Sequence, residues 1–259
     1  TDVEVDTELP EEEDTFIGDE LNPDAESDQD LQTDKEYTVL LVEDNKEFRH
    51  YMFELLSKKY NVLEAGDGEE GERIATTKFP DLIISDIMMD GLELCKRIKS
   101  NIQVSHIPVI LLTARSTDES KLFGYESGAD EYISKPFNLD ILLLRIRKLI
   151  NEEKARQKSF SQGININPGE VTITSIDEQF IEKVCSLIQK NIDNPEYSVE
   201  KLSADVGMER TVLYRKLNAI AGQTPSDFIR SIRLKHAAQL LNKGYQVGEV
   251  ADMVGFNTP

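Results

Sequence analysis

Hydrophobic and polar positions follow a regular order along residues 37–151. Short apolar runs alternate with longer segments whose apolar residues recur at helical spacing. Polar or turn residues bound each run, and each run has the length of one strand. The pattern predicts five strands, at residues 37–44, 61–65, 81–86, 107–114 and 131–134. It predicts a helix after each strand, at residues 45–60, 67–79, 91–100, 117–128 and 138–151.

This alternation is typical of an α/β protein with a doubly wound, five-stranded parallel sheet. The first, third and fourth strands are almost continuously hydrophobic, which fits strands covered by helices on both faces. In such a sheet the first and third strands are expected to be neighbours, at the point where the winding direction reverses.

The rest of the chain divides into three further segments. Residues 1–36 hold sixteen acidic residues and one lysine, with no periodicity, which predicts an acidic disordered linker. Residues 152–175 are polar, and Gly and Pro mark them as an interdomain linker. Residues 176–259 are helical throughout and form the second domain.

Charge and cysteine content exclude few functions. The formal net charge is −20, but residues 152–259 carry only −1 of it, and residues 198–245 hold eight basic and four acidic residues. Cys95 and Cys185 lie in apolar helical patterns and are predicted to be reduced, buried thiols. No apolar run reaches the roughly 18 residues of a membrane helix, so we expect no membrane contact and a cytoplasmic location.

Polar residues of several kinds stand where the predicted strands end. Glu43 and Asp44 end the first strand, Asp86 the third, Thr113 the fourth and Lys135 the fifth. Each alone also suits a cap, a turn or a solvated surface. The carboxyl ends of parallel strands meet at one edge, where carboxylates repel unless a cation such as Mg²⁺ joins them. A hydroxyl and an ammonium group beside them suit a phosphoryl group on Asp86.

The segments VLLVEDN, PDLIISDIMM, PVILLTAR and SKPFN resemble a bacterial response-regulator receiver domain across residues 37–151, a flavodoxin-like fold. The resemblance implies that Asp86 is the phospho-acceptor, with Thr113 and Lys135 beside the phosphoryl group. It implies Mg²⁺ held by Asp44, Asp86, the backbone carbonyl of Met88 and, through water, Glu43. It also implies Tyr132 as the switch aromatic and a cis bond between Lys135 and Pro136.

The chain departs from the receiver pattern after Met89. The family has a Pro-x-Met segment before Asp90 and Gly91, and three residues of that loop are missing here. Phosphatases of the haloacid dehalogenase type also form an aspartyl phosphate, but they need a second Asp where this chain has Met88. We therefore expect phosphorylation and dephosphorylation of Asp86, and no turnover of an external substrate by this chain.

The second domain opens with a helix, a turn at Gly207 and a second helix, which predicts a helix-turn-helix with Ser198 as the first N-cap. Leu202, Val206, Val212, Leu213 and Leu217 are its predicted core. A generic helical hairpin explains this stretch equally well. The continuation, with GQTPSDFIRSIRLKHAAQLL and YQVGEVADMVGFNTP, resembles the AraC-type DNA-binding domain, which joins two such units by a long helix, here about residues 225–242.

The AraC resemblance implies specific contacts with double-stranded DNA. Thr211 and Arg215 match residues that reach base edges, Arg210 and Tyr214 flank them, and Arg230 is a candidate for a phosphate contact. Glu209 stands where the family has a capping Ser. The sequence ends at Pro259, where the second recognition helix is expected to begin, so the second unit is incomplete in these residues.

Together the resemblances imply the C-terminal part of a hybrid two-component regulator, of the kind that controls carbohydrate-use genes in gut Bacteroidetes. Its partners are then a histidine kinase, double-stranded DNA, and a second copy bound through residues 118–150. The kinase would belong to the same longer chain, which is anchored in the inner membrane. The alternative is a receiver that passes its phosphorylation state to a protein partner without binding DNA.

Overall fold

The computed structural model describes residues 35–114, 128–162 and 175–256. Five parallel strands form one sheet in the order β2-β1-β3-β4-β5, as expected for the doubly wound fold. The strands are β1 (Thr38–Val42), β2 (Asn61–Ala65), β3 (Leu82–Asp86), β4 (Val109–Thr113) and β5 (Glu131–Ser134). The predicted positions of all five strands are therefore confirmed to within a few residues at their ends.

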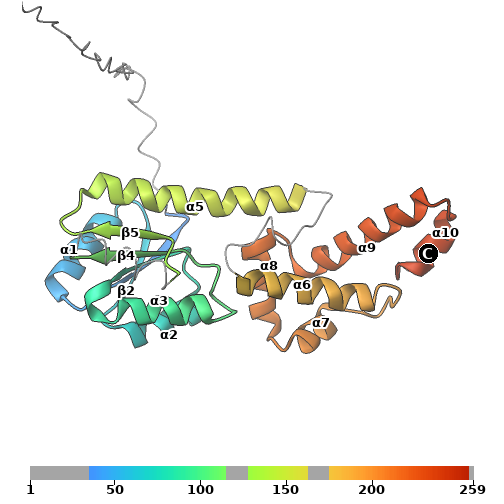
Figure 1. Cartoon of the computed structure of the whole chain (residues 1–259), viewed down its shortest axis with the longest axis horizontal. Helices are drawn as coiled ribbons and strands as arrows, with labels where there is room; N and C mark the ends of the chain where they lie inside the picture. Colours follow the sequence, from blue (N-terminus) through green and yellow to red (C-terminus); the bar gives the residue numbers. More distant parts are fainter. Residues whose placement is uncertain (1–34, 115–127, 163–174, 257–259) are drawn as a thin grey trace, which may run out of the picture. The chain divides into compact units, whose positions relative to one another are not determined.

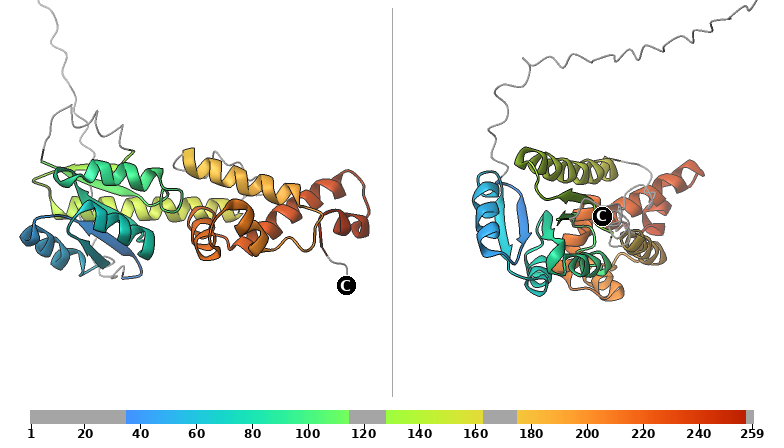
Figure 2. Two further views of the ribbon diagram at one scale, coloured as in Figure 1. Left: turned by 90° about the horizontal axis from the view of Figure 1, so that it is seen from below. Right: turned by 60° about the vertical axis from the view of Figure 1, so that its left-hand side comes forward.

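Alternate residues of the central strands face two separate hydrophobic cores. Val39 and Leu41 of β1 pack in one core with residues of α1 (Lys46–Leu56) and α5 (Leu139–Gln162). Leu40 and Val42 pack in the other with α2 (Gly68–Lys78) and α3 (Gly91–Ser100). Helices cover both faces of the sheet (Figures 1 and 2), which is why these strands are hydrophobic at every position.

Side-chain caps start the first two helices. The carboxamide oxygen of Asn45 accepts from the backbone N–H groups of Glu47 and Phe48, and the carboxylate of Asp67 accepts from that of Glu70. The helix expected at residues 117–128 falls almost wholly outside the described residues.

Helix α5 is longer than the sequence pattern predicted. It continues past Asn151 to Gln162, into the segment that we expected to be a linker. The residues from Glu152 to Lys158 favour helix and include no Gly or Pro, and the first glycine follows at position 163. The apolar stripe that marked the predicted helix ends near Ile150, so periodicity alone placed the helix end too early.

The C-terminal part is helical, as predicted. Its helices are α6 (Ser175–Lys190), α7 (Val199–Val206), α8 (Arg210–Ala221), α9 (Pro225–Asn242) and α10 (Val247–Met253). Gly207 joins α7 to α8 with a φ of 81°, the left-handed conformation that glycine adopts without steric cost. Leu202, Val206, Leu213 and Leu217 are buried as expected, whereas Val212 is only partly buried.

Two sequence-based details of this part need correction. Ser198 and Glu209 do occupy the N-cap positions of α7 and α8, but neither side chain makes a capping hydrogen bond. Cys95 is buried as expected, whereas Cys185 is half-buried. Neither cysteine forms a disulfide.

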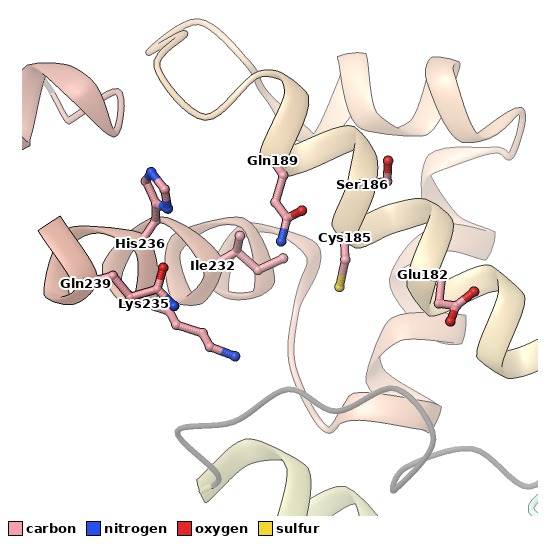
Figure 3. Close-up of a pocket in the computed structure, with 8 residues that line it drawn as sticks. All are labelled: Glu182, Cys185, Ser186, Gln189, Ile232, Lys235, His236 and Gln239. Atoms are coloured by element: carbon pink, nitrogen blue, oxygen red, sulfur yellow. The ribbon is translucent and has the colours of Figure 1, made fainter.

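Cys185 borders a hollow of about 330 Å³ between α6 and α9, together with Gln189, His236 and other mainly polar side chains (Figure 3). Burial raises the pKa of the Cys185 thiol to about 11, so the thiolate, which is the reactive form, is scarce at neutral pH. Among the described helices, none is both long and apolar enough to cross a membrane.

Candidate functional site

Three carboxylates lie together at the carboxyl edge of the sheet. Glu43 and Asp44 follow β1, and Asp86 ends the neighbouring strand β3. Their ligand oxygens lie within 4.8 Å of one another, and Glu43 and Asp86 are buried while Asp44 is exposed. A group of carboxylate oxygens with one side open to solvent has the donor chemistry that a hard divalent cation prefers.

Lys135 provides positive charge to the same group. Its ammonium nitrogen donates to a carboxylate oxygen of Asp86 at 2.9 Å and to one of Glu43 at 3.0 Å. The lysine follows β5, so the ion pair joins residues that lie 49 and 92 positions apart in the chain. The nitrogen also lies 4.3 Å from the ring centroid of Phe48, within the range of a cation–π interaction.

Burial and ion pairing act on these charges in opposite directions. Burial raises the pKa of the Glu43 carboxyl, although its hydrogen bond and ion pair with Lys135 oppose the shift. Burial also opposes the charge of Lys135, but its contacts with Asp86 and Glu43 prevail and raise the pKa of this ammonium. Lys135 is therefore charged at neutral pH, whereas burial disfavours ionisation of Glu43.

The segment after Asp86 is compact. A carboxylate oxygen of Asp86 accepts from the backbone N–H of Met88 at 3.1 Å, within a single 3₁₀ turn of residues 87–89. Asp90 then has a φ of 60°, and α3 begins at Gly91. A Cβ atom at Gly91 would lie 2.0 Å from the backbone oxygen of Asp86, so only glycine fits. The chain thus passes from β3 to α3 through one tight turn, which accommodates the shortened loop.

The remaining residues predicted for this site lie nearby in the fold. Thr113 ends β4 and is buried, and its carbonyl oxygen accepts from the backbone N–H of Lys135 at 2.6 Å. Tyr132 lies in β5, partly buried against the core formed with α2 and α3. The Lys135–Pro136 bond is cis, as the resemblance implied. The side chain of Met88 is exposed.

Helix α8 presents the side chains that we predicted to contact DNA. Arg210, Thr211, Tyr214 and Arg215 are all exposed, as is Arg230 on α9. Arg210 forms an ion pair with Glu200 at 2.7 Å. The guanidinium of Arg215 lies 4.6 Å from the ring centroid of Phe79, the residue that follows α2.

Sequence patterns did not single out several residues that complete these sites. Phe48 and Arg49 lie on α1 at ordinary helical spacing, yet Phe48 packs against Lys135 and Arg49 donates to the backbone oxygen of Glu43 at 2.5 Å. Lys216 on α8 is fully buried, although a lysine between Arg215 and Leu217 has the sequence appearance of a solvated residue.

Comparison with known families agrees with both parts of the fold. Residues 39–147 match the family model of the response regulator receiver domain, and residues 202–259 match a model of a helix-turn-helix domain, which is of the AraC type. Response regulator ArlR of Staphylococcus aureus is 31% identical over 169 residues, which cover 63% of this chain and 76% of that protein. The chain belongs to the response-regulator family. The expected order of a receiver followed by an AraC-type domain is thus confirmed.

Other relatives of this response regulator are much longer proteins. The chain is 44% identical over 241 residues to "Histidine kinase P4" of Formosa agariphila, a match that covers 91% of this chain but 18% of that protein. A hybrid signal transduction histidine kinase of Dictyostelium discoideum is 38% identical over 122 residues, which cover 46% of this chain and 8% of that protein. The chain therefore spans a small fraction of these two relatives.

Solved structures similar to this response regulator include a signal receiver domain of a histidine kinase from Syntrophus aciditrophicus. It is 32% identical, with a TM-score of 0.44, and the match covers 46% of this chain and 92% of that one. A Francisella receiver domain is 31% identical, with a TM-score of 0.42, and covers 45% of this chain and 98% of that one.

Proposed function

We propose that a histidine kinase phosphorylates Asp86 of this response regulator, and that the phosphorylation state controls sequence-specific DNA binding by the AraC-type domain. The observation that carries the proposal is the placement of the Lys135 ammonium 2.9 Å from the Asp86 carboxylate, within a group of three carboxylates. After phosphoryl transfer, Lys135 and the hydroxyl of Thr113 would contact the new oxygens.

A divalent cation is part of the proposal. Glu43, Asp44 and Asp86 fit Mg²⁺ because they offer several hard oxygens close together, and Asp44 is open to solvent. We assign Asp44, Asp86 and the backbone carbonyl of Met88 as direct ligands and Glu43 as a ligand through water. Bound Mg²⁺ would offset the repulsion among the carboxylates and neutralise charge on the transferred group.

The intact mass of the protein after incubation with acetyl phosphate and Mg²⁺ tests the phosphorylation step. We expect one phosphoryl adduct on the wild type and none on Asp86→Asn, which keeps the shape of the side chain. Asp140→Asn is the matched control, since Asp140 lies in the first turn of α5 outside this site, and it should still accept the group. An adduct on Asp86→Asn would refute the assignment of Asp86.

DNA is the proposed output partner. Five exposed side chains on α8 and α9 support direct contact with a duplex: Arg210, Thr211, Tyr214, Arg215 and Arg230. The alternative is a receiver that acts only through a protein partner. Duplex binding whose affinity falls as salt is added favours DNA as the partner, because phosphate contacts release counterions. No binding at low salt would favour the alternative.

A second copy of the chain is the proposed partner in the active state. Ile141 and Leu144 on α5 are exposed apolar residues, which a partner surface could cover. Part of the predicted face, residues 118–127, lies outside the described residues. Arg145 on the same helix pairs with Glu131 at 3.4 Å, and Arg145→Glu should weaken a phosphorylation-dependent dimer. If the phosphorylated variant dimerises to the same extent as the phosphorylated wild type in sedimentation experiments, this face is not the dimer interface.

The wider biological role is proposed on resemblance. The relation to the Formosa protein supports a place at the output end of a hybrid kinase, acting in the cytoplasm, where chromosomal DNA lies. Control of carbohydrate-use genes rests on the family resemblance alone, and genome-wide mapping of bound promoters would test it.

A further inference from the structure

Helix α8 contacts the receiver through the same side chains that are proposed to read DNA. The guanidinium of Arg215 lies over the Phe79 ring, 4.6 Å from its centroid. Tyr214 and Arg215 also border a hollow of about 380 Å³, whose other walls include Phe79, Pro80 and His106 of the receiver. The outward face of α8 therefore meets receiver residues in this arrangement.

A buried polar cluster fixes α8 to the receiver next to this contact. Lys216 is fully buried and forms an ion pair with Asp177 of α6. Its ammonium nitrogen also lies 2.9 Å from the Ser105 hydroxyl oxygen and 3.2 Å from Nδ1 of His106, both in the loop before β4. The Ser105 hydroxyl donates to the carboxylate of Asp177 at 2.7 Å. The receiver thus supplies Ser105 and His106, two of these three polar partners of the ammonium.

The receiver groups are suited to this ammonium. Burial lowers the pKa of the His106 imidazole well below its usual value, and Lys216 and Lys99 lower it further. The imidazole is therefore neutral and can accept a hydrogen bond from Lys216 at Nδ1. In the docked arrangement Ser105 and His106 offset part of the cost of removing this ammonium from water, so loss of either partner should weaken docking.

The long helix α5 makes a third contact with α8. The side-chain amide of Gln157 donates to the backbone oxygen of Ala219 at 2.6 Å, near the end of α8. A Cβ atom at Gly222, the C-cap of α8, would lie 3.2 Å from the backbone oxygen of Gln157. The contact comes from the extension of α5 beyond Asn151, so one continuous helix links the receiver sheet to the end of α8.

Duplex DNA and the receiver cannot both occupy this face of α8. A helix with its side chains is about 10–12 Å across, and the major groove is about 12 Å wide, so a helix that reads bases fills the groove. Arg215 cannot point to a base edge while its guanidinium lies on Phe79.

We propose that the receiver and DNA compete for α8, and that the contacts of Arg215 with Phe79 and of Lys216 with Ser105 and His106 hold the DNA-excluding state. This inference rests on the proposed function, because it assumes that α8 binds DNA. It does not depend on which event releases the helix.

Duplex affinity of the full chain tests the competition. The double variant Phe79→Ala/His106→Ala removes the ring under Arg215 and one partner of Lys216. Tyr51→Ala is the matched control, because Tyr51 is an exposed receiver aromatic on α1 that lines neither the hollow nor the cluster. We expect the double variant to bind a labelled random-sequence duplex about tenfold more tightly than the wild type, a typical coupling between two sites. Tyr51→Ala should match the wild type.

Gln157→Ala provides a second test that leaves both cores intact. It removes one hydrogen bond and should tighten duplex binding about threefold. Adding the duplex to the wild type should also speed amide hydrogen exchange at His106 and Ile107, since α8 leaves that loop.

The outcomes separate this inference from the proposed function. If all forms bind the duplex with equal affinity and exchange at His106 and Ile107 does not change, the receiver does not compete for α8 and this inference alone is overturned. If no form binds the duplex, including the folded double variant, the DNA-binding function fails and the inference fails with it.

Discussion

The ammonium nitrogen of Lys135 lies 2.9 Å from a carboxylate oxygen of Asp86, across the carboxyl edge of the parallel sheet. The same nitrogen lies 3.0 Å from Glu43, which is buried. A single lysine therefore offsets the charges of two buried carboxylates. This arrangement makes the stability of the receiver sensitive to the charge balance at the site.

Replacing Lys135 by Met should destabilise the protein, because Glu43 and Asp86 lose their shared cation. We expect a loss of about 3 kcal/mol in the free energy of unfolding, the lower end for breaking a buried pair. Mg²⁺ should restore more of the stability in this variant than in the wild type. Urea denaturation with and without Mg²⁺ measures both effects. Lys148→Met breaks an exposed ion pair with Glu152 and should cost about 0.5 kcal/mol or less.

Glu43→Gln should change how stability depends on pH. Burial raises the pKa of Glu43 above its ordinary value of 4.5, so the folded protein binds this proton more tightly than the unfolded chain. The cost of ionising Glu43 is absent below pH 4.5 and grows as the pH rises above it. The variant should therefore gain stability relative to the wild type as pH rises above 4.5. Thermal melts of the wild type and the variant without Mg²⁺ measure this difference. If the melting temperatures of the two proteins change equally across this pH range, the pKa of Glu43 is not raised.

Acid should release α8 from the receiver. The pKa of His106 lies well below its ordinary value of 6.5 in the folded state, because burial, Lys216 and Lys99 oppose its charge. A released His106 takes up a proton below pH 6.5 that the docked state excludes, so the docked state loses stability as pH falls. Duplex affinity of the wild type should rise below pH 6.5 by more than that of His106→Ala. Identical pH profiles of the two proteins would exclude this role of His106.

Gly91→Ala should disrupt the turn beside Asp86. The new methyl group would lie 2.0 Å from a backbone oxygen, and backbone cannot move aside as a flexible side chain can. We expect a loss of about 3 kcal/mol, with phosphorylation of Asp86 impaired. Gly248→Ala is the matched control, since a Cβ atom there meets nothing within 4 Å. Gly248 lies in α10, where alanine should leave stability equal or raise it by about 0.5 kcal/mol.

Arg215 and Arg230 should differ in their effect on DNA binding. Arg215→Ala should cost about 1–3 kcal/mol on the preferred sequence and relax specificity at one base pair, as expected for a base contact. Arg230→Ala should weaken binding to all sequences alike. It should also reduce the slope of log affinity against log salt concentration by the amount expected for about one phosphate contact. Competition assays over a set of single-base variants of a selected site, at several salt concentrations, distinguish the two. If Arg215→Ala has the same sequence specificity as the wild type, Arg215 does not contact a base.

The sheet and its candidate site could be predicted because their determinants are local. Apolar runs ending in Asp86 or Thr113 predict buried strands, and the winding rule brings the ends of β1 and β3 together. The turn at Gly207 between two amphipathic helices was readable, but a helical hairpin fitted that stretch equally well, and the resemblance of the following segment to the AraC type decided for a helix-turn-helix. The end of α5 was missed because the prediction relied on an apolar stripe, and residues 152–162 have none. These residues are helical because of their intrinsic propensity.

The sequence by itself determined the two domains, the adjacency of the first and third strands and the residue types at the carboxyl edge of the sheet. Periodicity and chain direction suffice for these features. Only the tertiary structure decided the partners of Lys135 and the burial of Lys216, whose contact with Ser105 joins positions 111 residues apart. A lysine in a sequence carries no sign of whether it will be solvated or buried. That outcome depends on whether folding brings carboxylates and hydroxyls within reach to offset the loss of water.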